Sequence, residues 1–406
     1  MSKSGLPVFT VAMMVTGNLL GAGILALPIN LGPAGILPAI VGIVLVWALM
    51  LMSSYILADQ KELMSGETSG LPSFFELKLG PIGKWIAVVA DLIILYGVLT
   101  AYLVGITSIM VNLFDLSYGW MVTLIFFAVV AGLTSFGVVI LRKCNAVIMI
   151  TMVITFLILL GMVMPEVNFA RAMPMKWDFL PAALPVVLTA FLYHNLIPTV
   201  CRELNNDKAA VRKAMFIGSV IGLAMNLSWT LFVFCALPMH GPDGISILHA
   251  FQLNLPATVP LSKLLDSSFF TNVGLAFAIL SMTAAFMANG IALLDFLHDL
   301  GSNTFKMDNK ILIWLVAFIP PLFVSLAYPD IFLVAMNVVG GIGVCIFFGI
   351  LPSFLLLKQG GTKNKALGWT MLVLFGFIMI FELGQEFGLT HIHPDIDYWI
   401  HQPFGG

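Results

Sequence analysis

The sequence predicts an all-α integral membrane protein that crosses the bilayer eleven times. Of its 406 residues, 60% are hydrophobic and 9% are charged, and the mean hydropathy is +1.05. Ordinary soluble domains are roughly 45–50% apolar and about 25% charged, so this composition excludes a water-soluble fold. The apolar residues form runs of roughly 18–28 residues, the length at which a helix crosses about 30 Å of hydrocarbon. Because backbone groups in lipid must be satisfied internally, these runs are expected to be helices.

Eleven apolar segments fit this length. We expect helices at residues 7–28, 34–58, 82–112, 119–140, 146–164, 181–203, 214–237, 269–297, 311–328, 331–357 and 367–388. They form a single transmembrane domain over 1–406, with halves at 7–165 and 181–357 and an extra helix at 367–388. The longest outer connection, Pro238–Ser268, is expected to hold a short amphipathic helix around Ile245–Phe251. No connection is long enough for a catalytic domain, so the function is expected to lie within the membrane.

The positive charges lie mostly on one side of this arrangement. With the N-terminus inside, 15 of the 18 Lys and Arg residues fall in inner segments, and only Arg171, Lys176 and Lys263 fall outside. Cytoplasmic segments of membrane proteins carry the excess of Lys and Arg. We therefore predict a cytoplasmic N-terminus and an outside C-terminus.

The first predicted span contains residues that weaken a helix. Its middle reads VTGNLLGAGI from Val15 to Ile24, with three glycines and Asn18 at mid-membrane depth. Glycine lowers helix propensity, so an interruption is expected here. The alternative explanation is tight helix packing, because Gly17 and Gly21 form a GxxxG pattern.

The sixth predicted span contains a second interruption. It reads FLYHNLIP from Phe191 to Pro198. Pro198 lacks a backbone donor and disfavours helix at the residue before it, and the titratable His194 stands beside Asn195. Taken alone, a histidine in this position is more often a satisfied core residue than a functional one.

The two interruptions lie in the first and sixth spans, five spans apart, so they occupy corresponding positions in two oppositely oriented halves. Interrupted helices in this arrangement mark the binding site of secondary transporters. Freed N–H groups at the start of a half-helix attract a carboxylate, and freed carbonyls hold a cation. The sequence therefore predicts a site for a zwitterion.

A set of ordered stretches spread over most of the chain carries a family resemblance. They are GNLLGAGILALP at 17–28, an N-x-V pattern followed by TF-x-x-x-L within 145–165, FLYHNLIP at 191–198, RKAMFIGSVIGLAMNLSW at 212–229, LDFL at 294–297 and GILP at 349–352. In these stretches the chain resembles the hydroxy and aromatic amino acid permeases, the bacterial tyrosine and tryptophan permease family of the amino acid–polyamine–cation group. The resemblance implies a LeuT-like 5+5 inverted repeat with discontinuous helices 1 and 6 and an appended helix 11. It also implies proton-driven uptake of an amino acid, here aromatic, across the bacterial inner membrane.

The interruptions and the resemblance together give a set of candidate substrate-binding residues. The substrate carboxylate is assigned to backbone N–H groups around the first interruption, and the ammonium to carbonyls near Thr16 and Phe191. Tyr96, Thr100 and Tyr102 of the third span are expected to face the pocket, although core packing explains these side chains equally well. The candidate set is Thr16, Gly17, Asn18, Gly21, Ala22, Gly23, Tyr96, Thr100, Phe191, Tyr193, His194 and Asn195.

Few ionisable groups lie within the spans. His194 titrates nearest to neutral pH and is the first candidate for proton coupling. Asp91, about 13 Å into its helix, is the second. Glu382 and Glu386 share one helix face at a spacing of four residues, where like charges repel, and are interpreted as solvated or as holding one proton between them.

The predicted coupling ion is H⁺ rather than Na⁺. In this architecture a sodium site uses hydroxyls on the eighth span, where this chain has Ala284 and Ala285. Ser281 or Thr283 would restore such a site in a shifted register. No cofactor or metal is expected, because the four cysteines lack metal-ligand spacing and the tail at 391–397 is interpreted as solvated.

Two alternatives stay open within the transporter class: a serine/threonine symporter and a broad neutral amino acid symporter, driven by protons or by sodium. An intramembrane enzyme would need a nucleophile–base or metal constellation, and His194 has no evident partner in the sequence. A nutrient sensor would need a sizeable signalling domain. We therefore expect no enzyme activity, and the expected partners are a small amino acid and the lipid bilayer, with no nucleic acid and no obligate protein partner.

Overall fold

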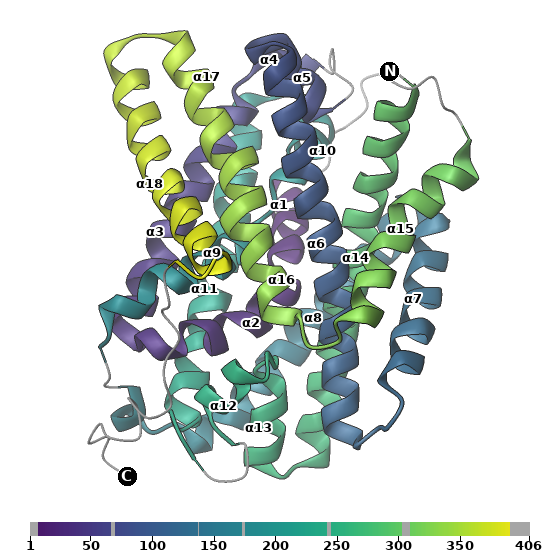
Figure 1. The fold of residues 1–406 in the computed structure, drawn as a ribbon, viewed down its shortest axis with the longest axis vertical. Helices are drawn as coiled ribbons and strands as arrows, with labels where there is room; N and C mark the ends of the chain where they lie inside the picture. Colours follow the sequence, from purple (N-terminus) through teal and green to yellow (C-terminus); the bar gives the residue numbers. More distant parts are fainter. Residues whose placement is uncertain are drawn as a thin grey trace.

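The computed structural model describes residues 7–65, 70–136, 138–172, 175–241, 245–302 and 309–389, with the side chains of 64–65, 138–146 and 172 left aside. Within these ranges the regular elements are all helical and no strand occurs (Figure 1). The α-helices are α1 (Val8–Leu19), α2 (Ala22–Leu31), α3 (Ile36–Ala58), α4 (Lys61–Ser65), α5 (Leu71–Leu79), α6 (Pro81–Phe114), α7 (Gly119–Ser135), α8 (Val138–Val163), α9 (Leu180–Ala190), α10 (Ile197–Glu203), α11 (Lys208–Ala236), α12 (Ile247–Gln252), α13 (Thr258–Leu265), α14 (Ser268–Leu300), α15 (Lys310–Ala327), α16 (Phe332–Val338), α17 (Leu351–Gln359) and α18 (Thr362–Glu386). Shorter 3₁₀ segments include η1 (Gly32–Ala34) and η5 (His194–Leu196), and a π-helix spans Val339–Ile350.

The prediction of an all-helical protein with many membrane spans is confirmed. Nine helical segments among the described residues are long and apolar enough to cross a bilayer, and the bent pair Val8–Leu19 and Ala22–Ala34 makes a tenth if it is one span. The remaining predicted span, 119–140, corresponds to the shorter apolar helix α7 of 17 residues. The exact count of eleven spans stays a prediction.

Several short helices lie at the two ends of the molecule. In Figure 1, α4, α5 and the turn between α17 and α18 lie at the upper end, and α12 and α13 lie at the lower end. The helix α12 occupies the position of the amphipathic helix expected around Ile245–Phe251. The elements assigned by charge to the inner side thus lie opposite those assigned to the outer side.

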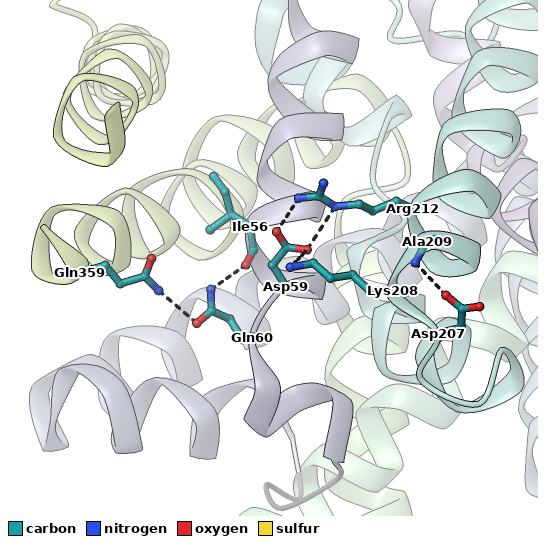
Figure 2. A network of polar contacts seen from close by, with 8 residues as sticks. All are labelled: Ile56, Asp59, Gln60, Asp207, Lys208, Ala209, Arg212 and Gln359. Carbon is teal, nitrogen blue, oxygen red and sulfur yellow. Dashed lines mark hydrogen bonds and ion pairs between the residues drawn. The ribbon is translucent and has the colours of Figure 1, made fainter. Parts of the chain in front are cut away.

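A cluster of ion pairs and hydrogen bonds ties three helix ends together at the upper end (Figure 2). Asp59, just after α3, accepts from Arg212 Nε at 3.1 Å and pairs with Lys208 Nζ at 3.1 Å, both on α11. The Asp207 side chain caps α11 by accepting from two backbone N–H groups, including that of Ala209 at 2.9 Å. The neighbouring Gln60 accepts from Gln359 at the end of α17 at 3.2 Å. Chain segments from positions 59, 212 and 359 are therefore fixed to one another here.

The π-helix packs closely against its neighbours through glycines. A Cβ at Gly340 would lie 1.8 Å from the carbonyl oxygen of Pro185 in α9, and a Cβ at Gly343 would lie 2.7 Å from Ile94 in α6. Neither position has room for a side chain. π-Helical turns are rare and often accompany functional sites, and this one lies between α6, α9 and α18.

Candidate functional site

The first predicted interruption is present. The helix α1 ends at Leu19 and α2 begins at Ala22, and the chain bends by 51° at this break. Gly21 precedes α2 in an extended conformation, and no side chain in the described part of the chain caps this helix start. The first N–H groups of an α-helix have no acceptor within the helix, so the backbone donors around Ala22 and Gly23 are available to an anion.

The second predicted interruption is also present. The helix α9 ends at Ala190, residues 191–193 are not helical, and η5 then leads into α10. Pro198 takes the first turn of α10, where the missing N–H costs nothing because that group would have no helical acceptor. Proline therefore marks the start of the second half-helix.

One hydrogen bond joins the two interruptions. Asn18 Nδ2 donates to the carbonyl of Leu192 at 2.8 Å. Nearby, the backbone of α2 lies directly on α9, since a Cβ at Gly23 would be 2.6 Å from Cα of Ala190. The glycine-rich segment therefore breaks the helix and, at Gly23, also permits close packing on α9.

A cavity lies where these segments meet. Its wall combines the first interruption, two residues of α6, the end of α9, Leu192 of the second interruption, and single residues of α14 and α16: Asn18, Leu19, Gly21, Ala22, Gly23, Val98, Tyr102, Thr189, Ala190, Leu192, Asn289 and Met336. The free space is about 10 Å³, room for the centre of about one water molecule. An amino acid therefore fits only if the lining helices separate.

Asn289 of α14 connects the polar groups at this cavity. Its Nδ2 lies 3.4 Å from the Tyr102 hydroxyl and donates to the carbonyl of Ala285 at 2.9 Å, and its Oδ1 accepts from Asn195 Nδ2 at 3.3 Å. The sequence analysis did not single out Asn289. The available signal was a buried amide four residues after Ala285, on the same face of an apolar helix.

Of the candidate residues, Asn18, Gly21, Ala22 and Gly23 line the cavity, and Asn195 reaches it through Asn289. The side chains of three other candidate residues form hydrogen bonds away from the cavity. Thr16 Oγ1 donates to the carbonyl of Gly218 at 3.1 Å, Thr100 Oγ1 donates to the carbonyl of Tyr96 at 2.8 Å, and the Tyr96 hydroxyl donates to the carbonyl of Val316 at 2.8 Å.

Gly17 and Phe191 flank the cavity without being part of its wall. Gly17 faces Met149, whose Sδ would lie 2.2 Å from a Cβ at this glycine. Phe191 is fully buried, and its N–H lies 3.2 Å from the carbonyls of Val187 and Leu188.

Tyr193 and His194 point toward α3 rather than into the cavity. The Tyr193 hydroxyl and Ser54 Oγ share a hydrogen bond of 2.7 Å, and His194 Nε2 lies 3.1 Å from the carbonyl of Met50. Ser53 donates to the carbonyl of Phe348, whose ring lies 4.5 Å from that of His194. Among the described residues none forms a hydrogen bond with the buried His194 Nδ1, an arrangement that suits the neutral imidazole with its proton on Nε2.

Asp91 lies on α6, nearer the start of that helix than the residues of the cavity wall. It is 7% exposed and shares a helix face with Val98 and Tyr102, at spacings of seven and eleven residues. It lies about 10 Å along the axis from Val98. Among the described residues no cluster of three His, Cys, Asp or Glu side chains could hold a metal, and the predicted solvated tail at 391–397 lies outside that part of the chain.

Comparison with known proteins decides the family. A family model described as "Tryptophan/tyrosine permease family" matches residues 5–384. The chain belongs to this family. The resemblance drawn from the short stretches along the sequence is thereby confirmed.

Curated relatives cover nearly the whole chain. Tyrosine-specific transport system 1 of Haemophilus influenzae is 27% identical over 357 residues, covering 85% of this chain and 86% of its own length. A tryptophan-specific transport protein of Pseudomonas aeruginosa is 25% identical, and the match covers 96% of this chain and 95% of that protein. The low affinity tryptophan permease of Escherichia coli K12 is 24% identical, and the match covers 94% of this chain and 93% of that protein.

A solved structure shares the fold. The crystal structure of a manganese transporter from Eremococcus coleocola superposes with a TM-score of 0.59, covering 97% of this chain and 90% of that one, at 13% sequence identity. The likeness concerns the arrangement of helices. Together with the apolar spans, the family and the fold make this an integral membrane protein.

Proposed function

We propose that this permease is a secondary active transporter that imports an aromatic amino acid, tyrosine, tryptophan or phenylalanine, by proton symport with alternating access. One observation carries the proposal: two interrupted helices, joined by Asn18 and the Leu192 carbonyl, open onto the same cavity. The named relatives are tyrosine and tryptophan transport proteins, which supports the substrate class.

The cavity offers complementary groups to an amino acid. The start of α2 presents backbone N–H groups to a carboxylate, and carbonyls freed near Thr16 and Phe191 are assigned to the ammonium. Val98, Leu19 and Met336 supply an apolar wall for a ring. Since the free space holds about one water, substrate entry requires these helices to part, as alternating access demands.

The coupling ion is assigned to H⁺. One residue of α14 that faces the first interruption is Ala285, whose Cβ lies 3.4 Å from the position of a Cβ at Gly21. It brings no hydroxyl for sodium. Ser281 Oγ donates to the carbonyl of Ala278 within its own helix. We keep His194 and Asp91 as proton-coupling candidates, with His194 neutral in the present conformation.

The proposed arrangement in the membrane follows the charges. We assign the end with α4, α5 and the α17–α18 turn to the cytoplasm, which puts the N-terminus inside and the C-terminus outside in a bacterial inner membrane. Within it, the proposed organisation is a LeuT-like 5+5 inverted repeat with α18 as the appended eleventh helix.

Transport by purified protein tests the proposal. Proteoliposomes with a lower external pH should accumulate labelled tyrosine, and unlabelled tryptophan or phenylalanine should compete. Competition by serine or threonine alone would favour the alternative substrate class, and a requirement for sodium would remove the proton assignment. The absence of any amino acid uptake, while a control permease is active, would refute the proposal.

A further inference from the structure

A buried carboxyl lies away from the cavity, in α18. Glu382 is 1% exposed, whereas Glu386, one turn further on and the last residue of the helix, is exposed. The two side chains of this pair therefore differ in environment: one is accessible at the helix end and the other is enclosed. An ionisable residue within a membrane span is a functional candidate because burying its charge is unfavourable.

Glu382 is enclosed by the π-helix. A Cβ at Gly341 would lie 2.5 Å from Glu382 Cγ, so the glycine makes the space that the carboxyl side chain occupies. The hydrogen bond that the structure gives this carboxyl comes from its own helix, where Gln385 Nε2 donates to Oε2 at 3.2 Å. A buried carboxylate normally needs a cation or several donors.

No cation faces Glu382 from the described elements packed around it, which are the π-helix, α17, α9 and α18 itself. α9 contains no ionisable side chain, and the π-helix contains only Cys345. The one ionisable residue of α17 is Lys358, in its last turn, where it donates to the carbonyl of Lys78. On α18, Glu386 lies one turn away, and Lys363 and Lys365 lie in the first turn at the other end. The neutral acid suits this environment better than the carboxylate.

We infer that Glu382 is a proton-binding site linked to the substrate cavity through the π-helix. The inference rests on the proposed function and adds Glu382 to His194 and Asp91 as a group that the coupling proton would occupy. The proton adds to a carboxyl oxygen and makes the neutral acid; its release leaves an anion against Gly341 with one amide donor.

Two contacts connect Glu382 with the cavity wall. Gly341 contacts Glu382, and the adjacent Gly340 contacts Pro185 and Thr189 of α9, with Thr189 Oγ1 2.6 Å from the position of a Cβ. Thr189 Oγ1 in turn donates to the carbonyl of Met336 at 2.8 Å, and both residues line the cavity. A change in how α18 packs on the π-helix therefore reaches the wall of the cavity.

The test compares E382Q with E386Q in proteoliposomes. Glutamine keeps the size of the side chain and stays neutral, so E382Q mimics the protonated state permanently. Two activities are measured with labelled tyrosine: accumulation driven by an inward proton gradient, and counterflow against unlabelled tyrosine with no gradient. E382Q should lose at least about tenfold in gradient-driven accumulation while its counterflow stays within about twofold of the unmodified protein. E386Q, with the same change at an exposed position of the same helix, should keep both activities.

Each result decides the matter. Accumulation by E382Q equal to that of the unmodified protein overturns the inference, as does loss of counterflow along with accumulation, because exchange without a gradient needs no proton site. If the unmodified protein shows counterflow but no response to the proton gradient, the site falls while tyrosine transport stands. If it shows neither, the proposed function fails first and the inference with it. Loss of gradient-driven accumulation by both variants would assign the effect to charge at the helix end and would also overturn the inference.

Discussion

Gly23 offers the sharpest test of how the two interrupted helices fit together. In Gly23→Ala, the new Cβ would lie 2.6 Å from Cα and 2.8 Å from Cβ of Ala190, and 3.2 Å from its backbone nitrogen. Ordinary contact begins at 3.4 Å, so α2 and α9 must separate by about 0.8 Å. The obstacle is backbone, which cannot rotate out of the way. Overpacking of this kind costs about 1–3 kcal/mol, which outweighs the gain of about 0.5–1 kcal/mol that alanine brings to a helix.

The same displacement moves the N–H groups assigned to the substrate carboxylate. A misplacement of about 1 Å at a reacting or binding centre can cost on the order of 100-fold, so we expect tyrosine uptake by Gly23→Ala to fall by tenfold or more. The matched control is Gly376→Ala in α18, where a Cβ would meet nothing within 4 Å. Thermal unfolding in detergent and initial uptake rates are the assays. A Gly23→Ala protein as stable and as active as the Gly376→Ala control would refute the close contact and the role assigned to it.

Three further outcomes are expected. Asn289→Ala removes the amide between Tyr102 and Asn195 and should raise the KM for tyrosine more than it lowers the maximal rate, at a stability cost of about 1–3 kcal/mol; an unchanged KM in uptake assays would contradict it. The hydrogen bond and charge of Lys78 lower the pKa of Glu62 from its ordinary 4.5, so this pair stabilises the fold above that pH and the effect is lost as pH falls through the lowered pKa. The free energy of unfolding of Glu62→Gln should therefore differ from that of the parent by at most about 1 kcal/mol at pH 7, and the two values should converge in acid. A difference that persists in acid would count against the pairing. Asp59→Asn removes two ion pairs (Figure 2) with half-exposed partners and should lower the free energy of unfolding by about 1 kcal/mol or less, with a smaller effect at high salt. A loss of thermal stability that does not depend on salt would show that the charges are not responsible.

The interruptions were predictable because glycine and proline act locally. Gly21 and Pro198 stand at the starts of the two half-helices, as their backbone preferences require. The lengths of the spans were less predictable. The sequence places a boundary near Arg142, yet α8 begins at Val138 and carries this charge within the helix, since a helix can extend past the apolar layer.

The site could be predicted only in part, because the sequence does not show which face of each helix points toward the cavity. α6 is apolar around its whole circumference, so spacing alone pairs Tyr96 with Thr100 as readily as Val98 with Tyr102. In the folded chain the second pair lines the cavity, and Tyr96 bonds to α15. The π-helix was not predictable either, because an apolar run carries no mark of where its turns widen. Asn289 and the burial of Glu382 depend on contacts between distant segments and needed the fold.

The bonds between α3 and the second interruption bear on how this protein moves. Met50, Ser53 and Ser54 lie within five residues of α3, and they hold His194, the Phe348 carbonyl and Tyr193 respectively. Separating α3 from the second interruption would break the two buried hydrogen bonds to His194 and Tyr193 at once. We therefore expect the middle of α3 and the segment from Tyr193 to His194 to move together when the cavity opens, and the hydrogen bond from Asn18 to the Leu192 carbonyl to be one of the contacts that break.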